Sequence, residues 1–129
     1  WKPWLRFVDM VEVAGNPEMP LLLVNKALDK LFEKTGRKPE EIAAYECNEA
    51  FAVIDELFAK KYPACVPAYN ACGGALAYGH PYGATGGILT LHLAKRLQQC
   101  AEDNVYGVSA IAAAGGQGTA ILWKKVCEK

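Results

Sequence analysis

Three short stretches of the chain carry side chains and glycines whose types suit chemistry. They are CNEAF at 47–51, GHP at 79–81 and AAAGGQG at 112–118. Each stretch lies where an expected strand or loop passes into the next element. Because α/β proteins build their sites from loops at strand ends, these stretches predict where a site would form.

His80 is one of only two histidines, and it lies in a glycine-rich stretch. A neutral imidazole can accept a proton from a thiol or hydroxyl and later return it. Pro81 restrains the backbone after it, and a helix is expected a few residues on. The alternative is a histidine held in an ordinary turn for local reasons, and the residues alone leave both interpretations open.

Asn48 has a simple structural interpretation, because asparagine is a favoured N-cap and a helix is expected to follow. The functional alternative is an amide that orients a water or a substrate carbonyl. The pattern favours the N-cap. We assign no catalytic role to His92, and Glu46 and Glu49 do not form a convincing acid/base pair.

The stretch 112–118 is open to two interpretations. It can be a turn that needs positive φ, or it can offer backbone N–H groups to an oxyanion. No lysine follows it, so it is not a phosphate loop. The spacing of Gly79, Gly83 and Gly86 also does not match a dinucleotide fingerprint.

The composition excludes several classes of function. The 129 residues carry 14 basic and 14 acidic side chains without a block of like charge. Nucleic acid and anionic membranes are therefore poor partners, and no apolar run reaches the roughly 18 residues of a membrane span. There is no secretory signal pattern. We expect a location in the cytoplasm or an organelle matrix.

The cysteines give a second exclusion. They are odd in number, and no two are spaced as CxxC, which argues against a zinc site and a disulfide framework. Free thiols suit a reducing compartment. They lie at positions 47, 65, 72, 100 and 127. The chain begins with Trp1 rather than methionine, from which we expect a fragment, a processed product or a trimmed chain.

The elements that must position these stretches follow from periodicity and from turn residues. We expect the order β-α-β-α-loop-α-β-β in a single domain over 1–129. This order predicts an α/β fold with a mixed β-sheet flanked by helices on its faces. The expected elements are a strand at 5–15, a helix within 16–36, a strand at 42–47, a helix from Asn48 to Pro63, a helix at 83–99, and two antiparallel strands joined by a turn at 113–118.

The core-facing side chains of the three expected helices follow from helical spacing. In the first helix they are Val24, Ala27, Leu28, Leu31 and Phe32. In the second they are Ala50, Val53, Ile54, Leu57 and Phe58, and in the third Ile88, Leu89, Leu93 and Leu97.

Together, CNEAFA, GGALAYGHPYGATGG and the terminal GGQG resemble the thiolase superfamily, in thiolase order and at similar separations. The resemblance covers nearly the whole chain and is to the C-terminal half of a thiolase only. It implies acyl transfer between coenzyme A and a nucleophilic cysteine, by thiolysis of 3-ketoacyl-CoA or by Claisen condensation. It also implies coenzyme A as a cosubstrate, with no permanently bound cofactor and no metal.

The resemblance implies that the nucleophilic cysteine and most coenzyme A contacts belong to an N-terminal half that this sequence lacks. We therefore expect that half, or a partner subunit, together with acyl-CoA, as partners. An unpaired half would expose a large apolar face, which predicts a homo- or hetero-oligomer.

By resemblance, His80 would activate the missing cysteine and help to polarise the thioester carbonyl. Asn48 would hold a water that completes an oxyanion hole. Ala114, Gly115 and Gly116 align with the family's glycine triplet, and the N–H of Ala114 could still serve an oxyanion.

The chain departs from the family pattern at Ala112, which stands where the family has its second acid/base cysteine. Alanine cannot transfer a proton. Three interpretations are open. The cysteine was exchanged to trap a complex, or another group such as a water held by His80 replaces it. The third interpretation is that the half is catalytically weakened. The departure also motivates an alternative function, a non-catalytic thiolase-like module for assembly or acyl-CoA binding.

Overall fold

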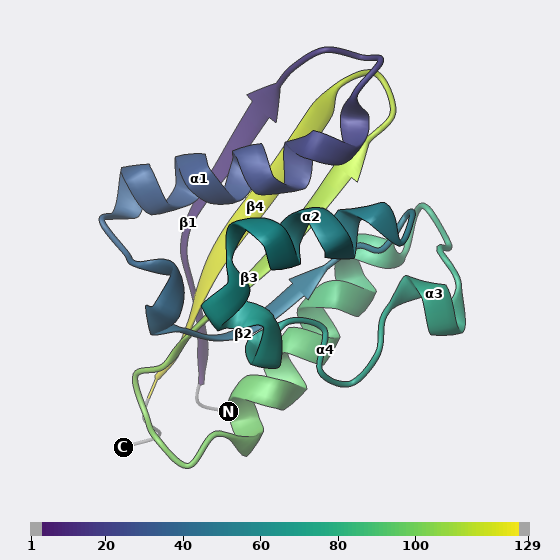
Figure 1. Ribbon diagram of the computed structural model, residues 1–129. Helices are drawn as coiled ribbons and strands as arrows, with labels where there is room; N and C mark the ends of the chain where they lie inside the picture. The colour runs from purple at the N-terminus through teal and green to yellow at the C-terminus, as the bar shows by residue number, and fades with distance from the viewer. Residues whose placement is uncertain (1–3, 127–129) are drawn as a thin grey trace.

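The computed structural model describes residues 4–126, so Trp1 and Cys127 lie outside the described residues. Its four strands form one sheet in the order β1-β4-β3-β2 (Figure 1). β2 and β3 are parallel, whereas β4 is antiparallel to both β1 and β3. The expected mixed sheet is confirmed. The strands are β1 (Leu5–Ala14), β2 (Ile42–Cys47), β3 (Tyr106–Ala113) and β4 (Gln117–Lys125).

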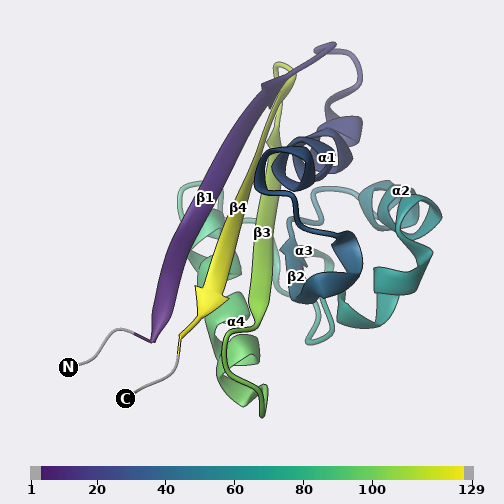
Figure 2. The same cartoon turned by 90° about the vertical axis from the view of Figure 1, so that its left-hand side faces the viewer.

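Helices cover both faces of the sheet, as Figure 2 shows with the strands seen nearly edge-on. The longer helices are α1 (Leu23–Thr35), α2 (Val53–Lys61) and α4 (Thr85–Gln99), and α3 is the single turn Ala75–Tyr78. Short 3-10 turns occupy Pro20–Leu22, Pro39–Glu41 and Pro63–Ala68. α1 packs on β1, β3 and β4, and α4 packs on β2 and β3.

Successive side chains of β3 point to opposite faces of the sheet, and they contact different helical layers. Val108 is buried in the main core with α1 and α2. Its neighbour Gly107 faces α4, where a Cβ would lie 2.8 Å from a Leu93 methyl carbon. Glycine at this position therefore allows α4 to approach the strand closely.

The first helix agrees with the sequence prediction. All five of its expected core residues are buried. Pro20 begins the 3-10 turn before it, and Gly36 ends it at φ 67°, a left-handed conformation that glycine adopts without a steric penalty.

The second helix begins later than predicted, at Val53, and the N-cap interpretation of Asn48 is wrong. Ala52 occupies the N-cap position, with no side-chain cap. Val53 is 44% exposed rather than buried, whereas Ile54 and Phe58 are in the core. The physical reason is that Asn48 still pairs with β3 through its N–H, which donates to Ala110 O at 2.9 Å.

The last helix begins at Thr85, and the β3–β4 connection is a tight turn at 114–116. Leu89, Leu93 and Leu97 are buried as expected, but Ile88 is only half-buried. The prediction of an antiparallel pair is confirmed. Gly116, at φ 83°, lies so close to Gly15 that a Cβ would collide with the Gly15 carbonyl oxygen.

Candidate active site

The structure brings Asn48 and His80 together from two different elements. Asn48 follows the end of β2 and is fully buried. His80 lies in the loop between α3 and α4. The distance from Asn48 Nδ2 to His80 Nε2 is 3.3 Å. The imidazole is only half-buried, so it remains accessible from the pocket described below.

Thr85 lies against one of the two ring nitrogens of His80. Its hydroxyl donates to Pro81 O at 3.1 Å and lies 2.7 Å from His80 Nδ1. With its single hydrogen directed to Pro81 O, the hydroxyl oxygen is available to accept the Nδ1–H of the imidazole. Nε2 is then unprotonated and accepts from the Asn48 amide. The arrangement therefore presents Nε2 as the basic nitrogen.

The Asn48 amide has unused hydrogen-bonding capacity. Its Oδ1 atom is buried and has no hydrogen-bond partner among residues 4–126. A buried carbonyl oxygen without a partner is costly, and such atoms are rare in native proteins. An amide in this state, beside a basic nitrogen, can hold a water or a polar group of a ligand.

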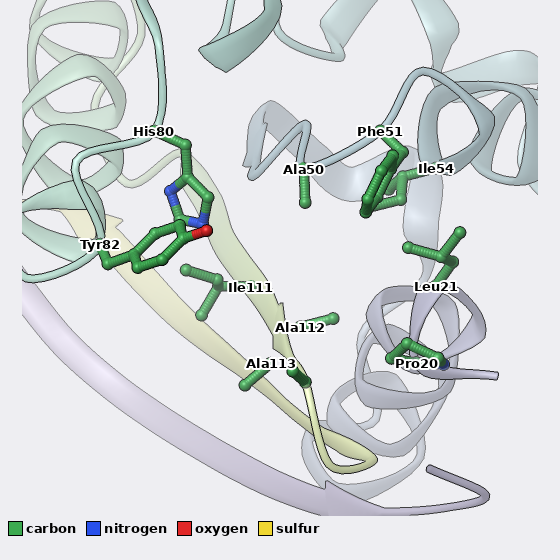
Figure 3. Close-up of a pocket in the computed structure, with 11 residues that line it drawn as sticks. Pro20, Leu21, Ala50, Phe51, Ile54, His80, Tyr82, Ile111, Ala112 and Ala113 are labelled. Carbon is green, nitrogen blue, oxygen red and sulfur yellow. The ribbon is translucent and has the colours of Figure 1, made fainter. Parts of the chain in front are cut away.

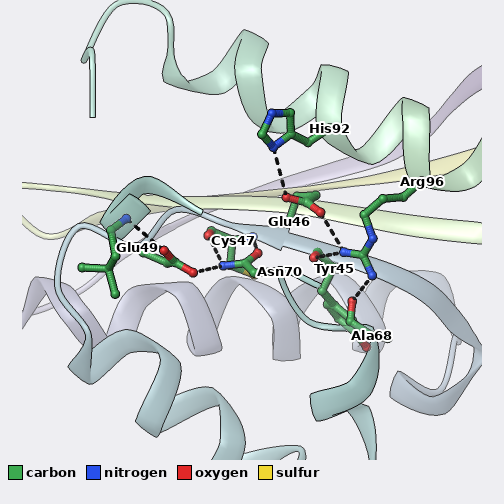
Figure 4. A network of polar contacts seen from close by, with 9 residues as sticks. Tyr45, Glu46, Cys47, Glu49, Ala68, Asn70, His92 and Arg96 are labelled. Carbon is green, nitrogen blue, oxygen red and sulfur yellow. Dashed lines mark hydrogen bonds and ion pairs between the residues drawn. The ribbon is translucent and has the colours of Figure 1, made fainter. Parts of the chain in front are cut away.

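A buried network holds the loop that carries His80 against the end of β2 (Figure 4). Glu49 accepts hydrogen bonds from Asn70 Nδ2 at 2.9 Å and from the N–H of Leu76 at 3.0 Å. Asn70 also exchanges two hydrogen bonds of 2.9 Å with the backbone of Cys47. Gly74 lies against Glu49, where any Cβ would collide with the carboxylate. The network fixes the relative position of the two site residues.

A second buried cluster joins α4 to β2. Glu46 is fully buried and accepts a hydrogen bond from Arg96 Nη1 at 2.7 Å. Arg96 also donates to Tyr45 O at 2.8 Å and to Ala68 O at 2.7 Å. Burial raises the pKa of the Glu46 carboxyl, although the ion pair with Arg96 opposes this shift. His92 Nδ1 lies 3.9 Å from the other carboxylate oxygen of Glu46.

A largely apolar pocket of about 530 Å³ opens beside His80 (Figure 3). This volume is within the range of small-molecule sites. Ala112 and Ala114 line it, so the position of the missing cysteine faces the same space as the imidazole. Tyr82 stands beside His80, with ring centroids 4.7 Å apart in an edge-to-face arrangement. The lining residues are Pro20, Leu21, Ala50, Phe51, Ile54, His80, Tyr82, Ile111, Ala112, Ala113 and Ala114.

None of the four described cysteines lines this pocket. Cys47, next to Asn48 in sequence, is fully buried, and desolvation raises its pKa far above that of a free thiol. Burial also raises the pKa of Cys65. Both thiols therefore stay protonated and unreactive.

Within residues 4–126 there is also no group of His, Cys, Asp and Glu side chains suited to a metal ion. Over the same residues, none of the helices combines the length and apolar character of a membrane span.

Sequence reasoning missed several of these residues. Thr85 reads as the ordinary start of a helix, and its position five residues after His80 was the only available signal. Glu49 and Asn70 are far apart in sequence, and only the fold brings them together. His92, assigned no role, proves to face Glu46.

The geometry defines a mixed α/β domain that offers an imidazole and an amide at the mouth of an apolar pocket. A family model for the C-terminal domain of thiolases matches residues 1–125. The chain therefore belongs to the thiolase C-terminal domain family.

Individual relatives agree with this assignment. A Mycobacterium leprae protein named "Probable acetyl-CoA acetyltransferase" is 37% identical over 124 residues, which cover 95% of this chain and 31% of that protein. A thiolase of Ascaris suum, solved in complex with coenzyme A, matches with a TM-score of 0.89 and 33% identity, over 97% of this chain and 32% of that one.

The peroxisomal 3-ketoacyl-CoA thiolase of Saccharomyces cerevisiae matches with a TM-score of 0.86 and 29% identity, over 95% of this chain and 34% of that one. That structure is described as five-layered and built from two core domains of identical topology. The chain thus spans about a third of the length of the proteins it matches.

Proposed function

We propose that this chain is the C-terminal half of a thiolase-type acyltransferase that acts on acyl-CoA or 3-ketoacyl-CoA thioesters. The observation that carries the proposal is the orientation of His80. Its Nδ1 lies 2.7 Å from the Thr85 hydroxyl oxygen, and its Nε2 lies 3.3 Å from the Asn48 amide nitrogen, beside an apolar pocket. A nucleophilic cysteine would come from an N-terminal half.

In this mechanism, His80 Nε2 takes the proton of that cysteine, and the thiolate attacks the carbonyl carbon of the substrate. The imidazolium then donates toward the oxyanion that develops. A water held by Asn48 supplies the second donor. The backbone N–H of Ala114, in the turn with Gly115 and Gly116, would serve a second oxyanion. Coenzyme A enters as a substrate rather than as a resident cofactor.

The N-terminal half would cover apolar side chains that are exposed in this chain. Three of them lie on the elements that frame His80: Phe51 is 62% exposed, Leu76 59% and Leu91 55%. Large exposed apolar side chains around one site are typical of an interaction surface. We therefore propose that the active protein is a complex or a longer chain, oligomeric, in the cytoplasm or an organelle matrix.

The alternative function is a non-catalytic module for assembly or acyl-CoA binding. Ala112 favours it, because the pocket lacks the thiol that the family uses for the second proton transfer. The intact geometry of Asn48, His80 and Thr85 favours catalysis, since a module that only binds needs no oriented base.

The test is a steady-state thiolysis assay of 3-ketoacyl-CoA substrates with the N-terminal half present. His80→Gln should lower kcat by at least about 100-fold, since general base catalysis contributes about 10² to 10⁴. His92→Gln is the matched control and should keep most of the activity. An unmodified protein that cleaves none of these substrates would favour the non-catalytic module.

A further inference from the structure

The pocket contains one group, besides His80, that can exchange a proton. Of its eleven lining residues, nine carry aliphatic, phenyl or proline side chains, and only His80 and Tyr82 have ionisable ones. Claisen chemistry needs two proton transfers, one at the attacking thiol and one at the α-carbon. With alanine at position 112, the second transfer has no assigned group.

Tyr82 is placed to supply that group. Its ring stands edge-to-face with the His80 ring at 4.7 Å, and Figure 3 shows the two side chains next to each other at the pocket. The phenol makes no hydrogen bond to any other residue within 4–126 and is 86% exposed. A phenol can both donate and accept a proton, and this one is free to face a ligand.

We propose that Tyr82 is the second acid/base residue of this site, in place of the thiol missing at position 112. The proposal rests on the proposed function. During thiolysis, His80 first takes the proton of the nucleophilic cysteine. As the bond between the α- and β-carbons breaks, the Tyr82 hydroxyl gives its proton to the α-carbon of the departing acyl-CoA and becomes a phenolate.

The second half of the cycle returns both protons. The phenolate recovers its proton from solvent, and coenzyme A, which has lost its thiol proton to solvent, attacks the acyl group on the cysteine as a thiolate. The cysteine leaves as a thiolate and recovers its proton from the His80 imidazolium. In condensation the phenolate removes the α-proton. No oxidant, metal or further reactant is needed.

Two partial reactions separate the roles of Tyr82 and His80. Exchange of labelled coenzyme A into acetyl-CoA needs only the cysteine and His80. Exchange of solvent deuterium into the acetyl methyl group also needs the α-carbon base. Both are measured in the complete enzyme, with the N-terminal half present.

We expect Tyr82→Phe to lower deuterium exchange and the kcat of thiolysis by at least about 100-fold. Its KM and its coenzyme A exchange should remain near the starting values. Tyr78→Phe, a matched removal of a nearby phenol outside the pocket, should change each rate by no more than about threefold. Adding Ala112→Cys to Tyr82→Phe should restore deuterium exchange at least tenfold, an effect that a merely structural role would not produce.

The proposal is overturned if Tyr82→Phe exchanges deuterium at the starting rate, or loses both partial reactions equally. In either case, loss of coenzyme A exchange in His80→Gln would still support the proposed function. If the unmodified enzyme exchanges coenzyme A but no deuterium, Tyr82 has no acid/base role. Absence of both exchanges overturns the proposed function together with this proposal.

Discussion

At the scale of single residues, the protonation state of His80 depends on one hydroxyl. Thr85 is buried, and its Oγ1 bonds both His80 Nδ1 and Pro81 O. Without that hydroxyl, the Nδ1–H has no acceptor, and the imidazole can take the other tautomer with Nε2 protonated. A protonated Nε2 cannot act as a base toward a thiol.

Thr85→Val keeps the shape of the side chain and removes the hydroxyl. We expect kcat to fall by about 10-fold or more, with a loss of about 1–3 kcal/mol in the free energy of unfolding from the two hydrogen bonds lost at His80 Nδ1 and Pro81 O. Nitrogen NMR of the imidazole should show the change of tautomer. The control is Thr90→Val, because Thr90 Oγ1 donates only to Gly86 O within the same helix. Equal effects of the two variants would contradict this role of Thr85.

The same scale shows what the sequence could and could not predict about the site. His80 and Ala112 were identified from short motifs, and they do line one pocket. Asn48 was misinterpreted as an N-cap because asparagine before a helix fits that pattern equally well. The sequence assigned no role to Thr85 or Tyr82, because their contacts depend on how the loop folds back on the imidazole.

At the scale of elements, β2 positions Asn48, and α4 positions Thr85 and the imidazole that Thr85 contacts. Asn48 follows β2, and Thr85 begins α4. Arg96, on the last turn of α4, joins this helix to β2 through hydrogen bonds to Tyr45 O and Glu46, and it also donates to Ala68 O in the turn Pro63–Ala68. The Arg96 side chain is only 11% exposed, so solvent screens this ion pair weakly.

Removal of the guanidinium should therefore be costly. Arg96→Met leaves the Glu46 carboxylate buried without its partner, and we expect a loss of about 3 kcal/mol in the free energy of unfolding. Chemical denaturation measures it, with Lys95→Met, an exposed neighbour on the same helix, as the control. A loss in Arg96→Met no larger than in the control would show that the ion pair does not hold α4 on β2.

The elements themselves were largely predictable. Helical spacing identified the buried stripe of α1 and most of that of α4, because each helix packs one side on a face of the sheet. The start of α2 was misplaced by about one turn. Ala50 stands at helical spacing from Val53 and Ile54, but the pairing of Asn48 with β3 keeps residues 48–52 out of the helix.

At the scale of the whole molecule, the mixed sheet brings four distant stretches to one pocket. Residues near 20, 50, 80 and 112 line it, and they come from both faces and the ends of three strands. The order of elements predicted the fold class. It did not predict the strand order β1-β4-β3-β2, which depends on long-range pairing that local patterns do not encode.

The free energy of unfolding of the whole chain should depend on pH through the titration of Glu46. Burial raises its pKa above the ordinary 4.5, so as pH rises from 4.5 the unfolded chain releases this proton before the folded chain does. The contribution of Glu46 to the free energy of unfolding therefore falls as pH rises through this window. Relative to Glu46→Gln, the unmodified chain should lose stability with rising pH. If the unmodified chain instead gains stability relative to Glu46→Gln as pH rises, Arg96 lowers the pKa of Glu46.

The central claim is that His80 Nε2 takes the proton of a cysteine supplied by an N-terminal half. The most direct measurement is the single-turnover rate at which acetyl-CoA acylates that cysteine in the complete enzyme. His80→Gln should slow acylation by at least about 100-fold, while His92→Gln stays near the unmodified rate. Acylation of His80→Gln at the unmodified rate would contradict the account.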